Sequence, residues 1–175
     1  MNQDELDDEL SQMYEENMTD KVLDSSTFKR PIKSLKLHKP IEVSPTQGVN
    51  EAVGLMQQKK LGCVLVTMGG KMVGIFTERD VLTRVFGKAG VEKLQVKDVM
   101  TANPERFQPD DSIAYVLNAM SVGGYRHVPV VNAMGKPIAV ISVRDIMSFL
   151  IEHFPEEVLN LPPSPMRKTD SREGA

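Results

Sequence analysis

Thr77-Glu78-Arg79-Asp80 recurs later in the chain as Ser142-Val143-Arg144-Asp145, and this repeated stretch decides the fold. Each copy has a hydroxyl residue, an arginine and an aspartate in the same order, and each follows a short apolar run. The two aspartates lie 65 residues apart, and Pro45 and Pro109 repeat at an interval of 64. A chain that repeats both its apolar pattern and a polar motif carries one structural unit twice.

Composition narrows the class of protein. The 175-residue chain has a formal net charge of −3, so it offers no global attraction to nucleic acid or to an anionic membrane. Its apolar runs are too short to span a bilayer, and the acidic N-terminus lacks a secretory signal. The single cysteine, Cys63, fits a reducing compartment. We therefore expect a cytoplasmic protein whose partners include neither a membrane nor nucleic acid.

Each repeat predicts the order β-α-β-β-α. Apolar residues at helical spacing predict the first helix of each unit: Val49, Ala52, Val53 and Met56, then Ile113, Val116, Leu117 and Met120. The expected strands cover 64–67 and 72–76 in the first unit and 128–131 and 137–141 in the second, with shorter ones at 41–43 and 105–107. Gly69-Gly70-Lys71 is typical of a hairpin turn. The second helices are expected from Thr77 to about Phe86 and from Ser142 to His153.

One such unit has too little structure to bury both faces of its sheet, so we expect two units packed sheet to sheet in an α/β fold. The predicted domains are an acidic leader with a short helix (1–30), units at 31–93 and 94–154, and a disordered tail (155–175). Within the leader, residues 24–27 are predicted to be a turn or linker.

The repeated motif has two chemical interpretations. A hydroxyl residue followed three positions later by an acid is typical of a helix capping box. The same geometry places free backbone N–H groups and a hydroxyl where they can bind phosphate, and a carboxylate where it can accept the hydroxyls of a ribose. The two roles are compatible, so the sequence leaves both open.

The paired motifs resemble those of cystathionine-β-synthase (CBS) domains, the Bateman module. The resemblance covers about residues 31–153 and rests on the two motifs with their preceding strands, on Val96 to Thr101, and on Tyr125 to Val131. It implies two β-α-β-β-α units related by a pseudo-two-fold axis, with two clefts for AMP, ADP, ATP or S-adenosylmethionine. Such modules regulate attached or partner proteins, perform no chemistry, and commonly associate as homodimers.

The resemblance also implies which residues bind the ligand. The hydroxyl and the ribose-binding acid fall on Thr77 and Asp80 in one cleft and on Ser142 and Asp145 in the other. Each cleft is expected to borrow a segment from before the first helix of the other unit: residues near Leu37 to Ile41 for the Asp145 cleft, and residues near Met100 to Phe107 for the Asp80 cleft. The full set of expected ligand-binding residues is Thr77, Arg79, Asp80, Arg126, His127, Val128, Pro129, Ser142, Arg144, Asp145, Ile41 and Thr101.

The two clefts are not expected to be equal. Arg126 and His127 stand where the family often has a basic group facing phosphate, and the first unit has Gly62 and Cys63 there. We therefore expect the phosphate-bearing ligand in the Asp145 cleft. His127 would be half charged near pH 6.5, so binding is expected to tighten as the pH falls towards 6.

Two other functions remain as alternatives. The clefts could be empty and the motifs only helix caps, in which case the chain is an interaction scaffold. An enzyme is not expected, because no activated nucleophile or acid–base pair is discernible. The three histidines show no metal-ligand spacing, and Cys63 begins an apolar strand, which favours a buried small hydrophobe over a nucleophile.

Overall fold

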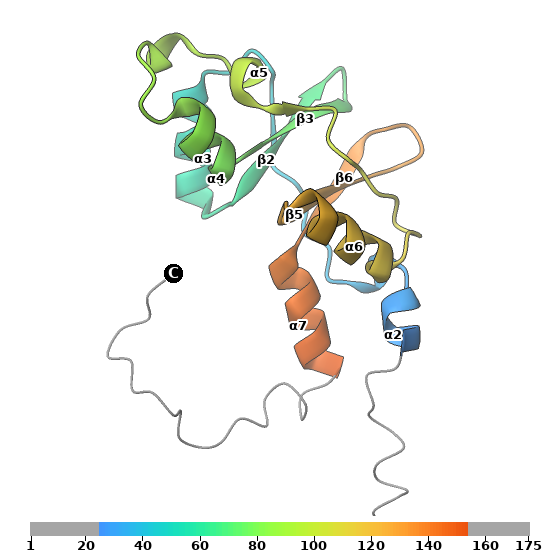
Figure 1. Cartoon of the computed structure of the whole chain (residues 1–175). Helices are drawn as coiled ribbons and strands as arrows, with labels where there is room; N and C mark the ends of the chain where they lie inside the picture. Colours follow the sequence, from blue (N-terminus) through green and yellow to red (C-terminus); the bar gives the residue numbers. More distant parts are fainter. Residues whose placement is uncertain (1–24, 154–175) are drawn as a thin grey trace, which may run out of the picture. The chain divides into compact units, whose positions relative to one another are not determined.

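The computed structural model of the chain describes residues 25–153 (Figure 1). Phe28–Ile146 form one compact unit, while residues 25–27 and 147–153 belong to a second unit and are described by themselves. The helix expected at Leu6 to Tyr14 and the tail from residue 155 lie outside the described residues. The turn or linker expected at residues 24–27 is wrong over residues 25–27, because α2 spans Ser25–Lys29. Serine and threonine favour helix starts as well as turns, so composition alone did not separate the two.

The first repeat builds a four-stranded sheet in the order β1-β2-β3-β4. Strands β2 (Cys63–Met68) and β3 (Lys71–Thr77) form the expected hairpin, with Gly69 and Gly70 at positive φ in its turn. Strand β1 (Glu42–Val43) pairs with β2 in parallel, and β4 (Thr101–Ala102) pairs with β3 in an antiparallel arrangement. The sequence did not predict β4.

The second repeat forms the same arrangement, but its edge strands are reduced to single bridges. Its hairpin consists of β5 (His127–Val131) and β6 (Pro137–Ser142). The strand predicted at 105–107 is reduced to a single parallel bridge between Phe107 and Val130, which corresponds to the pairing of Val43 with Val66 in β1 and β2. On the opposite edge of the second sheet, His38 forms a bridge with Val140. This bridge corresponds to the pairing of Thr101 with Ile75 in the first sheet.

Helices cover each sheet on the side away from the other. Helix α3 (Val49–Lys59) and the helix formed by α4 (Glu78–Asp80) and the π-helical η2 (Val81–Val85) pack on the first sheet, joined by α5 (Val96–Val99). Helix α6 (Ile113–Gly123) packs in the second unit, and α7 (Val143–His153) follows β6. Short 3-10 turns lie at η1 (Ile32–Ser34) and η3 (Val91–Lys93). The repeated β-α-β-β-α order predicted from sequence is confirmed.

Two apolar clusters show how the repeats pack. Val49, Ala52 and Met56 of α3 pack with Phe76 of β3 in the core of the first unit. A second cluster joins Cys63, Leu65, Met72 and Ile75 of the first sheet to Val131 and Val140 of the second. Because this cluster lies between the sheets, the sheet-to-sheet packing predicted from the size of one unit is confirmed (Figure 1).

The segments that begin the two repeats are exchanged between the units. Gln95, which follows the first repeat, bridges Gly48 at the start of α3. At the corresponding positions Pro31 bridges Ser112, although Pro31 lies far from the second unit in sequence. Ile32, just after Pro31, is fully buried, and its amide donates to the carbonyl of Asp111 at 2.8 Å. This exchange brings residues near position 38 to the second sheet and residues near 101 to the first.

Gly74 permits the close approach of β4 to the first sheet. A Cβ at this position would stand 2.4 Å from Sδ of Met100 and 3.1 Å from the carbonyl oxygen of Thr101. The second sheet has Ala139 at the corresponding position, and there the edge consists of the single His38–Val140 bridge. The two clefts therefore differ already in how their edge segments pair.

Candidate functional site

Both copies of the repeated motif cap a helix. In the first copy, Oδ2 of Asp80 accepts the backbone amide of Thr77 at 2.9 Å and its hydroxyl at 2.7 Å. The amide of Asp80 donates back to the hydroxyl at 3.3 Å, which completes a capping box at α4. In the second copy, the corresponding distances between Ser142 and Asp145 are 2.7, 2.8 and 3.3 Å. The capping interpretation is confirmed for both motifs, and one oxygen of each aspartate is committed to it.

A pocket of about 340 Å³ opens beside Asp80. This first pocket lies between the start of α4, the edge segment before Glu105, and the start of β5. Its lining residues are Gly62, Ile75, Thr77, Glu78, Arg79, Asp80, Thr83, Arg84, Thr101, Pro104, Glu105, Gly123, Tyr125, Arg126 and His127. The volume lies within the range of small-molecule sites.

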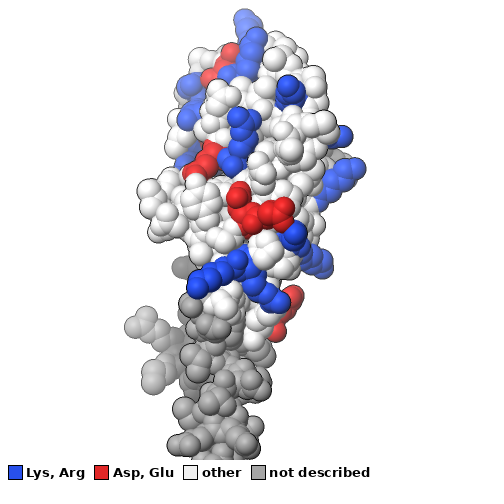
Figure 2. Space-filling model, turned by 90° about the vertical axis from the view of Figure 1, so that its right-hand side faces the viewer, with Lys and Arg blue, Asp and Glu red and all other residues white. Residues whose placement is uncertain are grey.

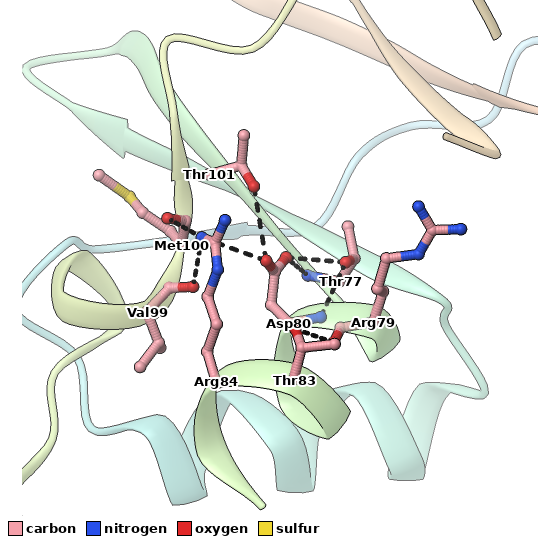
Figure 3. A network of polar contacts seen from close by, with 8 residues as sticks. All are labelled: Thr77, Arg79, Asp80, Thr83, Arg84, Val99, Met100 and Thr101. Carbon is pink, nitrogen blue, oxygen red and sulfur yellow. Dashed lines mark hydrogen bonds and ion pairs between the residues drawn. The ribbon is translucent and has the colours of Figure 1, made fainter. Parts of the chain in front are cut away.

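Two of the three arginines that line the first pocket, Arg79 and Arg84, already have partners. Arg79 donates to the carbonyl of Gly124 at 2.7 Å. Arg84 lies 3.3 Å from Oδ1 of Asp80 and donates to two backbone carbonyls (Figure 3). The hydroxyl of Thr101 lies 3.4 Å from the same oxygen. Both oxygens of Asp80 are therefore occupied by groups of the chain itself.

A second pocket of about 560 Å³ opens beside Asp145. Its lining residues are His38, Lys39, Pro40, Ile41, Lys60, Leu61, Gly62, Cys63, Glu78, Arg126, His127, Val140, Ser142, Val143, Arg144 and Asp145. Within residues 25–153, none of its lysines and arginines forms an ion pair, and the neighbour of Asp145 Oδ1 is Nε2 of His38 at 3.5 Å. In this range, Lys39, Lys60 and Arg144 are unpaired cations that line this pocket and not the first.

Charge distinguishes the two pockets further. The first has three arginines against three acids, and the second has two lysines and two arginines against two acids. Figure 2 shows acidic and basic side chains interspersed on the face in view, with no patch of one sign covering it. The second pocket therefore carries the greater excess of positive charge and attracts an anion more strongly than the first.

The structure divides the expected site residues between the pockets. Thr77, Arg79, Asp80 and Thr101 line the first pocket. Ile41, Ser142, Arg144 and Asp145 line the second. Two residues of β5, Val128 and Pro129, line neither pocket and are buried in the strand.

Arg126 and His127 line both pockets, whereas the sequence assigned them to the Asp145 cleft alone. Their exclusive assignment is wrong because β5 begins at the wall that separates the two cavities. Gly62 and Glu78 share this wall. A Cβ on Gly62 would stand 2.7 Å from the imidazole of His127, so the absence of a side chain at position 62 makes room for that ring.

Burial lowers the pKa of His127 below its ordinary value of 6.5. The negative charges of Glu78 and Asp145 oppose this shift, and the positive charge of Arg126 adds to it. Less than half of His127 is therefore charged at pH 6.5 in the folded chain. The half-charged state expected near pH 6.5 moves to lower pH, and that part of the sequence prediction is wrong. Sequence reasoning missed the shift because burial depends on how the start of β5 packs and not on the residue type.

We predict that the unliganded protein loses stability as the pH falls from about 7.5 to about 5.5. Below pH 6.5 the unfolded chain binds a proton that folded His127 does not, so the free energy of unfolding decreases with the excess of unfolded-state protonation. Thermal melts across this range should show a steeper decrease for the wild type than for His127→Gln, which cannot titrate. Parallel curves for the two proteins would contradict the assignment to His127.

Cys63 is buried, and burial, with a smaller effect from Glu78, raises its pKa to about 12. A thiol with this pKa is protonated at neutral pH and is a poor nucleophile. The interpretation of Cys63 as a buried small hydrophobe is confirmed. Over residues 25–153 no cluster of histidine, cysteine and acidic residues could hold a metal ion, and no helix there is long and apolar enough to cross a membrane.

Sequence reasoning missed Lys60 at the second pocket, Arg84 at the first and Glu78 at the shared wall. His38 and Lys39 line the second pocket and Glu105 lines the first, and all three fall within the segments that each cleft was expected to borrow. His38 takes the place opposite Asp145 that Thr101 takes opposite Asp80. Lys60 carries no sequence signal of this kind, since it ends α3 in a left-handed conformation.

Comparison with known proteins identifies the repeat. A family model described as the CBS domain matches residues 32–87 and 96–152, together more than half of the chain. The CBS domain-containing protein CBSCBSPB1 of Arabidopsis thaliana is 35% identical over 106 residues, which cover 60% of this chain and 20% of that protein. This chain thus spans about one fifth of the length of that relative.

Solved structures show the same fold. The CBS-domain containing protein ATU1752 from Agrobacterium tumefaciens has a TM-score of 0.63 and 33% identity, over 68% of this chain and 98% of that one. The fold is also shared with CBSX2, solved in complex with AMP (TM-score 0.62, 18% identity, 70% and 97% covered). The CBS pair of MJ0100, solved with 5′-methylthioadenosine and S-adenosyl-L-methionine, has a TM-score of 0.60 and 23% identity, with 69% and 94% covered. Because both matched domains coincide with the two repeats, the chain belongs to the CBS-domain family.

Proposed function

We propose that the chain is a regulatory module that binds an adenosine ligand (AMP, ADP, ATP or S-adenosylmethionine) and modulates a partner protein without catalysing a reaction. The observation that carries the proposal is the second pocket, where the incompletely occupied carboxylate of Asp145 and several unpaired cations line one cavity. A carboxylate at a helix start is suited to the hydroxyls of a ribose, and cations are suited to phosphate.

The phosphate-bearing ligand binds in the second pocket. Arg126 is exposed and has no ion-pair partner within the described part of the chain, so its guanidinium can bind a phosphate without first breaking a contact. Arg144, Lys39 and Lys60 line the same cavity. Two CBS pairs of the same fold, solved with AMP and with S-adenosylmethionine, support an adenosine ligand in general and leave its identity to experiment.

A thermal-shift screen of AMP, ADP, ATP, S-adenosylmethionine and NAD tests this proposal. A ligand at about 100 times its dissociation constant should stabilise the folded chain by about 2.7 kcal/mol. For a chain of this size, the melting temperature should then rise by roughly 5 to 10 °C. Guanosine and cytidine monophosphates serve as controls, because they carry the same phosphate and ribose without adenine.

The alternative function is a ligand-free interaction scaffold. It is favoured by one observation: each motif aspartate already satisfies its helix cap, so neither motif requires a ligand to explain it. If no adenosine ligand at about millimolar concentration raises the melting temperature by a degree, the scaffold replaces the sensor as the better account.

We further propose that the partner is in part a second copy of the chain, held through the helices. Leu82 and Phe86 are 70% and 81% exposed at the second helix of the first unit, and Val122 is 82% exposed on α6. Exposed large apolar side chains on helices that already cover a sheet fit a further helix surface.

Light scattering at roughly tens of micromolar should therefore report a dimer for the wild type. The double variant Leu82→Glu/Val122→Glu should be monomeric, because charges at these positions oppose burial without disturbing the core. The control variant Met68→Glu/Met134→Glu introduces the same two charges at exposed hairpin residues and should leave the dimer intact. A wild type that is monomeric both with and without AMP would refute the proposed self-association.

A further inference from the structure

The two oxygens of the Asp80 carboxylate have different partners (Figure 3). Oδ2 accepts both hydrogen bonds of the capping box from Thr77. Oδ1 faces the guanidinium of Arg84 at 3.3 Å and the hydroxyl of Thr101 at 3.4 Å. The side chain of Asp80 is 7% exposed. A ribose entering the first pocket would thus meet a carboxylate with no free acceptor.

Arg84 is fixed at this position by the backbone. Its Nη1 donates to the carbonyl oxygen of Val99 at 3.0 Å and to that of Met100 at 2.7 Å. These carbonyls belong to the segment that continues into β4, whose first residue, Thr101, lines the pocket. The guanidinium is therefore held by three partners at once, and its release would break all of these contacts together.

The second pocket lacks this arrangement. Oδ2 of Asp145 is committed to its helix cap in the same way, but Oδ1 has the imidazole of His38 as its neighbour at 3.5 Å, and the side chain is 18% exposed. The repeat interval of 65 residues that relates Asp80 to Asp145 places Phe149 at the position of Arg84. The second unit therefore carries no arginine there.

We propose that Arg84 is a specificity-determining residue that excludes ribose from the first pocket, so that each chain binds one adenosine nucleotide, at Asp145. This inference rests on the proposed function, in which ribose hydroxyls bind the motif aspartate. Binding in the first pocket requires the guanidinium to leave Oδ1, and the loss of this ion pair to a buried aspartate weakens binding by about 10-fold.

Calorimetric titration with AMP tests this inference through the number of nucleotides bound. The wild type should bind one equivalent. Arg84→Met, which keeps the length of the side chain and removes the charge, should bind a second equivalent at least about 10-fold more tightly than the wild type does. Arg84→Lys restores a cation beside Asp80 and should return the chain to one equivalent. Arg84→Gln serves as a second neutral variant that retains a donor for the carbonyls if Arg84→Met does not fold.

The double variant Arg84→Met/Asp145→Asn separates this inference from the proposed function. It should bind one equivalent, in the first pocket, and adding Asp80→Asn should abolish that binding. A merely structural role for Arg84 would lower the melting temperature of Arg84→Met without adding a bound nucleotide, and that result overturns the inference. Two equal sites in the wild type also overturn it while leaving the proposed function intact. Binding by Arg84→Met alone, with none by the wild type, supports the role of Arg84 and refutes occupancy of the second pocket.

Discussion

Asp145→Asn is expected to weaken the binding of AMP and of adenosine alike, by about 100-fold, while Arg126→Ala weakens AMP by about 10- to 100-fold and leaves adenosine nearly unchanged. In the proposed site, both ligands offer Asp145 the same ribose, and only AMP has a phosphate for Arg126. Asparagine keeps one acceptor for the amide of Ser142, so the helix cap is retained and the loss is confined to the ligand. Calorimetry of both ligands against both variants gives the four affinities.

Asp80→Asn is the matched control for this result. It makes the same change at the other motif, in the pocket where Arg84 already faces the carboxylate. We expect the affinity for AMP to change less than threefold, which is less than one hydrogen bond contributes. Equal losses in Asp80→Asn and Asp145→Asn, with none in Arg126→Ala, would contradict the inequality of the two pockets.

Phe107→Ala is expected to destabilise the fold by about 3–5 kcal/mol, the range for removing a buried phenylalanine. Phe107 is 1% exposed, and its ring meets that of Tyr115 edge to face at a centroid distance of 5.4 Å. Its amide donates to Pro129 at 3.0 Å and its carbonyl accepts from Val131 at 2.8 Å, so the side chain is held at the edge of the second sheet. The melting temperature should decrease by roughly 6 to 20 °C.

Two controls accompany this variant. Met134→Ala removes a side chain of similar size that is 74% exposed in the β5–β6 turn, and it should change stability by less than about 0.5 kcal/mol. Phe107→Leu should cost less than about 1.5 kcal/mol and gives a measurable protein if the alanine variant does not fold. If Phe107→Ala melted within a degree of the wild type, the edge segment at Phe107 would not be part of the core of the second unit.

The sequence predicted the elements whose signal is local. The hairpin at Gly69 and Gly70 needs glycines at positive φ, and the α3 stripe at Val49, Ala52 and Met56 follows the helical period, so both could be read from neighbouring residues. The 65-residue repeat then fixed the second unit by analogy. The capping boxes followed from the motif itself.

The elements that were missed depend on pairing with distant strands. Strand β4 contains only Thr101 and Ala102, so it is too short to show the alternation of apolar and polar residues that predicts a strand. It forms because Gly74 lets this segment approach β3. The bridge of His38 to Val140 likewise joins residues about 100 positions apart. Arg84 was missed because its position depends on hydrogen bonds to the backbone carbonyls of Val99 and Met100, and a pattern of side chains does not predict such bonds.

The site was predictable in its chemistry and less so in its boundaries. Asp80 and Asp145 were found because the motif repeats, but Arg126 and His127 proved to line both pockets. The lowered pKa of His127 arises first from burial, which depends on packing against the neighbourhood of Gly62 and not on the residue type. Val128 and Pro129 were carried over as neighbours of this pair, and their burial in β5 places them outside both pockets.

We expect an adenosine nucleotide to bind at Asp145 and not at Asp80. A crystal structure of the wild-type chain grown with AMP in slight excess over protein would show which pocket is occupied. We predict one nucleotide per chain, with its ribose hydroxyls on the carboxylate of Asp145, its phosphate within hydrogen-bonding distance of Arg126, and Arg84 still in contact with Asp80. A nucleotide whose ribose lies on Asp80 while the second pocket holds none would contradict the claim.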